Sequence, residues 1–280
     1  MEKTLANIRL IVVHAGKSSH QDERVAAAIA RAAGARAPVV RRDPTEAELA
    51  DANILVLDVG GQHNPALNNF DHHQLPREAA PACAYSLLAE HLGIDGKLAA
   101  LFPWYTTGKS LDSKGPFSTA KACGAEWSKI QGFYGPDTAW LADAWAESEG
   151  LREEVTQRLA DRIERKLDLY DAGVVAAAAN TERVGEIVVL RLDRMAAEYA
   201  EISDCLAGAV GANVIVFNDD RGDGLGILRL NDDPRLDFSK WEGKEGIVFA
   251  HKGGFIVKTA ASVKAEPDGV ARIIRGALVA

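Results

Sequence analysis

The hydrophobic positions in the first part of the chain form short continuous runs separated by polar turns. Residues 8–13 (IRLIVV) and 53–57 (NILVL) are typical of buried strands, and residues 39–40 predict a shorter one. Residues 22–33 follow an amphipathic pattern with acids in the first turn, which predicts a helix. Strand, helix and strand joined by short connections predict a doubly wound, mostly parallel α/β sheet.

The hydrophobic pattern of the middle of the chain changes along its length. A helix is predicted over residues 81–92, and another helical pattern runs over 137–170 with a break at Gly150. Residues 101–136 interleave aromatic side chains with Gly, Ser and Lys and show no period, so we expect an irregular insertion there. Such an insertion could stack bases or pack as core.

The alanine-rich residues 176–179 mark the expected domain boundary, which gives a first domain over 1–178 and a second over 179–280. A helix is predicted over 196–210, and another ends the chain. The predicted strands of this region are short and cover 187–192, 214–217, 226–230, 246–250 and 255–257. We therefore expect a second, smaller α/β or α+β domain.

Composition narrows the classes of partner. The 280 residues are 47% hydrophobic and 26% charged, as in ordinary folded proteins, and the net charge of −8 argues against a broad groove for duplex DNA. A small phosphorylated substrate stays possible, because bound cations would reverse the local field. Three widely spaced cysteines, no signal peptide pattern and no apolar run of membrane-spanning length predict a soluble cytoplasmic protein, whose oligomeric state is left open.

Histidine and aspartate recur where the predicted strands end. His14, His20 and Asp22 follow the first strand, Asp58 follows the third, and residues 71–73 (Asp-His-His) come thirteen positions later. Ligands of open α/β sheets bind beyond the carboxyl ends of the strands. Imidazoles with carboxylates suit Mn²⁺, Fe²⁺ or Zn²⁺ better than Ca²⁺. One such residue alone is ordinary, since an acid often caps the next element, but the repetition predicts a binuclear metal site.

Two further segments carry candidate chemistry. Asp171 stands where the predicted helix ends before Gly173, at the edge of its apolar side. Near the end of the chain, residues 246–256 predict two strands joined by a glycine turn. His251 and Lys252 in this turn could meet an anion, although a solvated hairpin turn is the simpler interpretation.

These motifs together resemble the DHH phosphoesterase superfamily. They are most similar to its Myg-type branch, the melanocyte proliferating gene-like or metal-dependent protein hydrolase branch. The similar motifs are D-V-G-G at residues 58–61, F-D-H-H-Q at 70–74 and H-K-G-G-F-I at 251–256. The resemblance implies a metal-binding catalytic domain, a smaller substrate-binding domain and a cleft between the two.

The resemblance also implies residue roles. The first ion would be bound by His14 and His20. The second would be bound by Asp22, His72 and Asp171, while Asp58 would bridge the two ions. His73 would face the scissile phosphate and Asp71 would orient its neighbours. The implied substrate-binding residues are His251, Lys252, Gly253 and Gly254.

The sequence departs from the branch at two places. The gap between His14 and His20 is one residue longer than usual, and Asp171-Ala-Gly stands where the branch has Asp-Asn-Gly. The expected function is a Mn²⁺-dependent phosphodiesterase, similar to a 3′–5′ exoribonuclease, in which a hydroxide shared by two ions attacks short single-stranded RNA or a small nucleotide. Mg²⁺, Fe²⁺ or Zn²⁺ could replace Mn²⁺. The alternatives are a phosphomonoesterase or pyrophosphatase, and a non-catalytic metal-binding regulatory protein.

Overall fold

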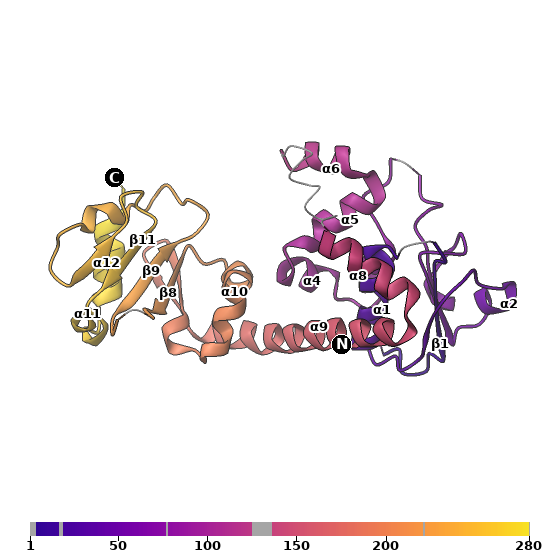
Figure 1. The fold of residues 1–280 in the computed structure, drawn as a ribbon. Coiled ribbons are helices and arrows are strands. Elements are labelled where there is room, and N and C mark those ends of the chain that lie inside the picture. Colours follow the sequence, from indigo (N-terminus) through magenta and orange to yellow (C-terminus); the bar gives the residue numbers. More distant parts are fainter. Residues whose placement is uncertain (1–3, 17–18, 77, 125–135, 221, 280) are drawn as a thin grey trace. The chain divides into compact units, whose positions relative to one another are not determined.

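The computed structural model describes residues 4–16, 19–76, 78–124, 136–220 and 222–279, and its chain forms two compact units (Figure 1). The first unit covers Met1–Leu167 and the second covers Asp168–Ala280. Helix α9 (Glu149–Ala179) carries the chain from one unit into the other and includes the alanine-rich segment. The units divide inside this helix, between Leu167 and Asp168, whereas the boundary expected at residue 178 stands at its end. Each unit is described here by itself.

The first unit contains a five-stranded sheet in the order β2-β1-β3-β5-β4. Its strands are β1 (Leu10–Val13), β2 (Val39–Arg41), β3 (Ile54–Leu57), β4 (His63–Asn64) and β5 (Asn69–Phe70). Strand β1 pairs parallel with β2 and β3, and β3 pairs parallel with β5. The α/β class is confirmed. The sheet is mixed rather than parallel throughout, because β4 and β5 are joined by four residues, too few for a crossover, and so pair antiparallel.

The helices predicted over residues 22–33 and 81–92 are present, with one short helix between β2 and β3. Helix α1 (Gln21–Ala32) is buried along nearly its whole length, as suits a helix packed between the sheet and other helices. The short helix α2 (Glu46–Leu49) begins with a capping box, in which the Thr45 side chain accepts a hydrogen bond from the backbone N–H of Glu48. Helix α3 (Ala84–His91) begins three residues later than predicted, with Cys83 at its N-cap.

The expectation of an irregular insertion over residues 101–136 is wrong for the part that the structure describes. This part forms the end of α4 (Asp95–Leu101), then α5 (Trp104–Lys114) and α6 (Pro116–Ala122). Phe102 and Tyr105 are buried, so these two aromatic side chains pack as core. Residues 125–135 lie outside the described residues.

The predicted helix end before Gly173 is also wrong. Helix α8 (Pro136–Glu147) stops before Ser148, close to the expected break at Gly150, but α9 continues through Gly173 to Ala179. A side chain at position 173 would place its Cβ 2.9 Å from a methyl group of Leu206 and 3.1 Å from the ring of Tyr199. Glycine is therefore used there for close packing, and packing outweighs its low helix propensity.

The second unit contains a six-stranded mixed sheet in the order β10-β11-β9-β8-β7-β6. Its strands are β6 (Thr181–Val184), β7 (Ile187–Arg191), β8 (Val214–Asn218), β9 (Leu225–Arg229), β10 (Ile247–Ala250) and β11 (Ile256–Thr259). The pattern missed only β6 among these, since three of its four residues are polar. The helix predicted over 196–210 divides into a 3₁₀ segment, Ala197–Ile202, and α10 (Ser203–Val210).

Helices α11 (Ala261–Ala265) and α12 (Gly269–Ala277) complete the second unit, and α12 packs on one face of the sheet. The core between them includes Val216, Ile227 and Ile273, all fully buried. None of the described helices has the length and apolar character that crossing a membrane would need.

Phe238 offers a test of this core. Its side chain is fully buried, so Phe238→Ala should lower the free energy of unfolding by about 3–5 kcal/mol, the usual cost of removing a buried ring. Urea denaturation followed by circular dichroism measures the change. Phe117→Ala is the matched control, because that ring is 71% exposed and its loss should change stability by less than about 0.5 kcal/mol.

Candidate metal centre

Three adjacent parallel strands deliver polar side chains to one edge of the first sheet. Strand β1 ends at Val13 before His14, β3 ends at Leu57 before Asp58, and β5 ends at Phe70 before Asp71. Because the strands run parallel, these residues emerge at the same edge. Asp58 adopts a left-handed backbone conformation, with φ of 59°, that Asp and Asn tolerate best among residues with side chains. The edge predicted from the sequence therefore exists.

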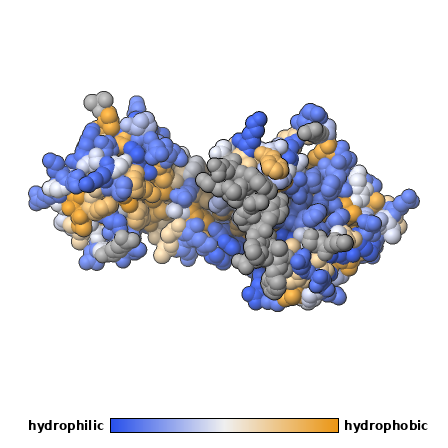
Figure 2. Space-filling view, turned by 45° about the horizontal axis from the view of Figure 1, so that its top comes forward, coloured by the Kyte–Doolittle hydropathy of each residue, from blue (hydrophilic) through white to orange (hydrophobic). Residues whose placement is uncertain are grey.

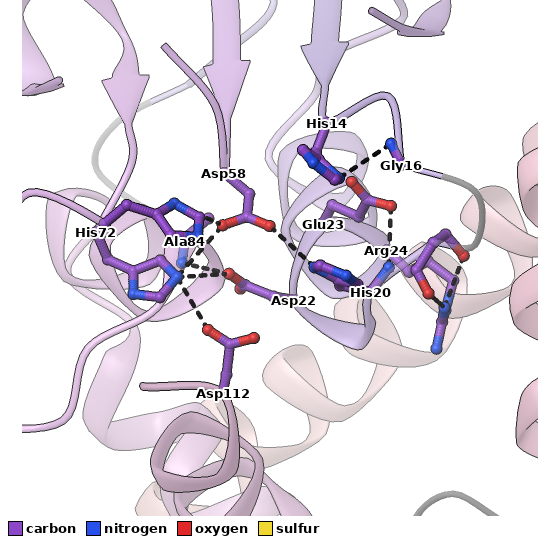
Figure 3. A network of polar contacts seen from close by, with 12 residues as sticks. His14, Gly16, His20, Asp22, Glu23, Arg24, Asp58, His72, Ala84 and Asp112 are labelled. Atoms are coloured by element: carbon purple, nitrogen blue, oxygen red, sulfur yellow. Dashed lines mark hydrogen bonds and ion pairs between the residues drawn. The ribbon is translucent and has the colours of Figure 1, made fainter. Parts of the chain in front are cut away.

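Asp58 lies between two histidines that come from different motifs (Figure 3). His20 Nδ1 is 3.6 Å from Asp58 Oδ2, and His72 Nε2 is 3.3 Å from Asp58 Oδ1. Burial disfavours the charged form of this carboxyl group, but the contacts with His20 and His72 outweigh it and hold the pKa of Asp58 well below its usual range. Its Oδ1 is buried, and its contacts with His72 Nε2 at 3.3 Å and His73 Nδ1 at 3.7 Å are ion-pair contacts rather than aligned hydrogen bonds. This oxygen is available to a cation.

Asp22 is held in place by the N-terminus of α3. Its two carboxylate oxygens accept hydrogen bonds from the backbone N–H groups of Ala84 at 2.9 Å and Tyr85 at 3.0 Å. The side chain is buried, and Oδ2 lies 3.8 Å from His72 Nε2. Burial and the negative charges of Asp58 and Asp112 raise the pKa of Asp22 well above its usual value. Asp22 is thus a fixed carboxylate in a site that attracts positive charge.

Asp112 is the member of this cluster that the sequence analysis missed. It projects from α5, and its Oδ2 lies 2.9 Å from His72 Nε2, which makes it the nearest of three carboxylates around that nitrogen (Figure 3). Asp112 sits inside the segment expected to be irregular, and no motif surrounds it. An acid on one face of a predicted helix would have been the signal, but the aromatic segment shows no helical period.

The cluster around His72 holds more negative than positive charge. Burial lowers the pKa of His72, but the carboxylates of Asp112 and Asp58, with that of Asp22, overcome this effect and raise it to about 10. Asp22, His72 and Asp112 each offer a ligand atom within 4.8 Å of the others, as do Asp58, His72 and His73. Three carboxylates around one imidazole, with an unbonded buried oxygen, fit a divalent cation.

His14 and His20 lie on the other side of Asp58. Their rings stack with centroids 5.3 Å apart, and His14 Nδ1 accepts a hydrogen bond from the backbone N–H of Gly16 at 3.1 Å. His20 is the N-cap of α1, and its own backbone N–H donates to Glu23 Oε1 at 3.0 Å. Glu23 is fully buried, and burial raises its pKa to about 7 although Arg41 opposes the shift. Although the gap between His14 and His20 is one residue longer than usual, the two imidazoles still lie together.

Asp71 fixes His73 rather than joining the carboxylates around His72. Its Oδ1 accepts from the backbone N–H of His73 at 2.9 Å and lies 2.7 Å from His73 Nδ1. Its Oδ2 accepts from the backbone N–H of Gly61 at 2.7 Å. The ring of His73 is 59% exposed and Asp71 engages its Nδ1, while its predicted contact with the substrate stays a prediction.

Asp71→Asn should therefore misplace His73 and lower turnover. The backbone N–H groups of Gly61 and His73 donate to different oxygens of the carboxylate, and an amide would set its own N–H against one of them, at a cost of about 1–3 kcal/mol in stability. Thermal unfolding and steady-state kinetics measure both effects. Asp232→Asn, at a side chain that is 95% exposed, is the control. Wild-type turnover in the Asp71 variant would contradict the orienting role.

Residues 10–83 match the family model MYG1_exonuc, described as an uncharacterised protein family, UPF0160. The resemblance to the Myg-type branch of the DHH superfamily is confirmed. The matched segment contains every strand-end residue from His14 to His73 and ends before Asp112. The match supports a metal-dependent hydrolase of the phosphoesterase or nuclease class, and the acid and histidine groups described above fit the divalent cation that such a hydrolase needs.

The comparison with solved structures gives a weaker similarity. A pGpG-specific phosphodiesterase, PggH from Vibrio cholerae, is 15% identical, and the match covers 96% of this chain and 98% of that chain with a TM-score of 0.33. This score is too low for a shared arrangement of the whole chain to follow from it. No curated protein matches the chain.

The remaining predicted site residues belong to the second unit. Asp171 is exposed on α9, and its role as a ligand stays a prediction. His251 Nδ1 accepts from the backbone N–H of Gly253 at 2.9 Å, and its ring centroid is 4.1 Å from that of Phe255. Gly254 has a left-handed φ of 67° in the turn between β10 and β11, where a side chain would clash with Asp237.

A hollow of about 430 Å³ lies beside this turn. It is lined by Glu242, Gly243, Ile247, Val248, Phe249, Ala250, His251 and Lys252. The face of the molecule in Figure 2 shows hydrophobic residues gathered on the second unit, whereas the first unit is mostly hydrophilic there. A charged and aromatic turn beside a hollow is compatible with substrate binding and equally with a solvated hairpin, so the predicted role of these residues stays a prediction.

Proposed function

We propose that this protein is a Mn²⁺-dependent phosphodiesterase that hydrolyses short single-stranded RNA or small nucleotides with two bound cations. The observation that carries the proposal is the place of Asp58, a buried carboxylate with an unbonded oxygen and an imidazole on each side. A carboxylate shared by two ligand groups is what a binuclear centre needs. The family match supports the hydrolase class.

Two ligand groups meet at Asp58 in this proposal. His20 with His14 forms the first, and the second is formed by Asp22, His72 and Asp112. Bound cations would supply a nucleophile at neutral pH and neutralise the charge that develops on the phosphoryl group. Mn²⁺ suits a mixture of imidazole and carboxylate ligands, and Mg²⁺, Fe²⁺ or Zn²⁺ would find the same donors.

The chain's own residues then have separate tasks. The N-terminus of α3 fixes the carboxylate of Asp22 through two backbone N–H groups. Asp71 holds His73 by its Nδ1, so that Nε2 can stabilise a phosphoryl oxygen or protonate the leaving oxygen. The hairpin turn of the second unit, with His251, Lys252 and its glycines, would bind the substrate.

The substrate class follows from charge. A chain with a net charge of −8 repels the backbone of a long duplex, whereas the end of a short strand needs only the local field of the cations. The three described cysteines are all free, which agrees with a reducing compartment and supports a cytoplasmic location.

A panel of substrates tests the proposal. The metal-free protein is reconstituted with Mn²⁺ and assayed with the dinucleotide pApA, a short RNA of mixed sequence, a duplex DNA, a nucleoside monophosphate and pyrophosphate. Cleavage of pApA and of RNA from one end, abolished by a chelator, is the expected result. Preference for the monophosphate or pyrophosphate would replace it with the monoesterase or pyrophosphatase alternative. Binding of one ion or none, without hydrolysis, would favour the regulatory alternative.

A further inference from the structure

The middle of α5 lies close to α1, which carries Asp22, and to α3, whose backbone N–H groups hold Asp22. Gly108 is the point of contact, because a Cβ at this position would lie only 2.9 Å from Tyr85 Oη and 3.7 Å from Gln21 Oε1. Real Cβ atoms essentially never lie so near another atom, so a larger residue at position 108 would require either α5 or the hydroxyl end of Tyr85 to shift. Gly108 thus allows a close crossing of α5 over α3 and the start of α1.

This crossing lies one helical turn from Asp112. Residues four apart share one face of an α-helix, so the face that rests on Tyr85 also carries Asp112. The carboxylate of Asp112 meets His72 (Figure 3). A displacement of α5 at Gly108 is therefore passed to Asp112 through the rigid helix. The contact between Asp112 Oδ2 and His72 Nε2 is 2.9 Å and leaves little tolerance for such a shift.

Tyr85 connects this crossing to Asp22. Its backbone N–H donates to Asp22 Oδ1 at 3.0 Å, and its hydroxyl donates to the carbonyl of Tyr105 in α5 at 2.6 Å. The side chain is only 1% exposed, and its ring lies 4.9 Å from that of Tyr105, centroid to centroid. Tyr85 therefore holds Asp22 through its backbone N–H, and through its hydroxyl it holds α5, the helix that carries Asp112.

We propose that Tyr85 and Gly108 are positioning residues that set the distance between Asp22 and Asp112 on either side of His72, and so tune the affinity of the cluster for its cation. This inference rests on the proposed function only in that a divalent cation binds these three side chains. Groups that orient metal ligands from outside commonly change metal affinity by about 10–100-fold.

Gly108→Ala, Tyr85→Phe and the double variant test this proposal together. The alanine methyl should push α5 away and weaken binding of Mn²⁺ at this cluster by at least about tenfold. Tyr85→Phe alone removes one hydrogen bond and should weaken it less. In the double variant the missing hydroxyl leaves room for the methyl group, so most of the lost affinity should return. Gly96→Ala is the matched control, because Gly96 also lies inside a helix but a Cβ there would meet nothing within 4 Å.

The measurement is isothermal titration of each metal-free full-length variant with Mn²⁺ alone, accompanied by urea unfolding. A variant that is only less stable would keep wild-type Mn²⁺ affinity in its folded state. Wild-type Mn²⁺ affinity in Gly108→Ala would overturn the proposal. A double variant that binds Mn²⁺ no more tightly than Gly108→Ala would overturn it as well. A wild-type protein that binds Mn²⁺ but cleaves no phosphodiester would refute the proposed function alone, and one that binds no Mn²⁺ would overturn both.

Discussion

Asp58→Asn should reduce Mn²⁺-dependent hydrolysis by more than about a hundredfold, beyond the range typical of residues that act from outside the ligand set. The amide removes the negative charge and leaves one acceptor oxygen, where the carboxylate offers two oxygens to the groups on either side. Asparagine isolates the loss of charge better than alanine does, because Asp58 has a left-handed backbone conformation that Asn adopts with little strain. The backbone should therefore survive while the centre is lost.

Two measurements separate loss of the ion from loss of the fold. Excess Mn²⁺ at about a hundred times its dissociation constant should stabilise the wild-type protein by about 2.7 kcal/mol, and this stabilisation should shrink or vanish in the variant. Asp51→Asn is the control, since Asp51 precedes β3, at the opposite end of that strand from Asp58, and its hydrogen bond with Arg9 involves no residue of the cluster. Retained hydrolysis in a preparation of Asp58→Asn with verified metal content would refute the shared role of Asp58.

The strand ends were predictable because their signal is local. Continuous apolar runs predict buried strands, and the residue after each run falls at a fixed edge of a parallel sheet, so His14 and Asp58 could be placed before any coordinates were known. The confirmed resemblance rests on the same residues. The side chains within these motifs are close in sequence or carried by adjacent strands, so their proximity follows from local patterns alone.

The features that escaped prediction depend on contacts between distant parts of the chain. Gly173 continues a helix because Leu206 packs against it, and Gly108 lies in α5 because Tyr85 needs the space. Glycine in a sequence normally predicts a break, and only tertiary packing reverses that expectation. Asp112 was missed for the same reason, since the helix that carries it follows packing more than pattern.

Asp112→Asn and Asp171→Asn, compared side by side, decide which carboxylate completes the second ligand group. The resemblance assigns Asp171, whereas the structure places Asp112 Oδ2 at 2.9 Å from His72 Nε2 within the first unit. Asn at position 112 can still accept a hydrogen bond from His72, so the fold and the cluster's shape should persist while the ligand's charge is lost. We expect Asp112→Asn to lower both Mn²⁺ affinity and hydrolysis by more than about a hundredfold, and Asp171→Asn to lower them far less.

The control for this comparison is Asp161→Asn, which removes an exposed carboxylate from the same helix as Asp171. Titration with Mn²⁺ and single-turnover kinetics on pApA measure binding and chemistry separately. Wild-type behaviour of Asp112→Asn with loss in Asp171→Asn would restore the family's assignment and require α9 to supply the ligand. Equal losses in both variants would mean that each carboxylate serves the centre, with Asp112 as an addition to the ligand set that the Myg-type motif describes.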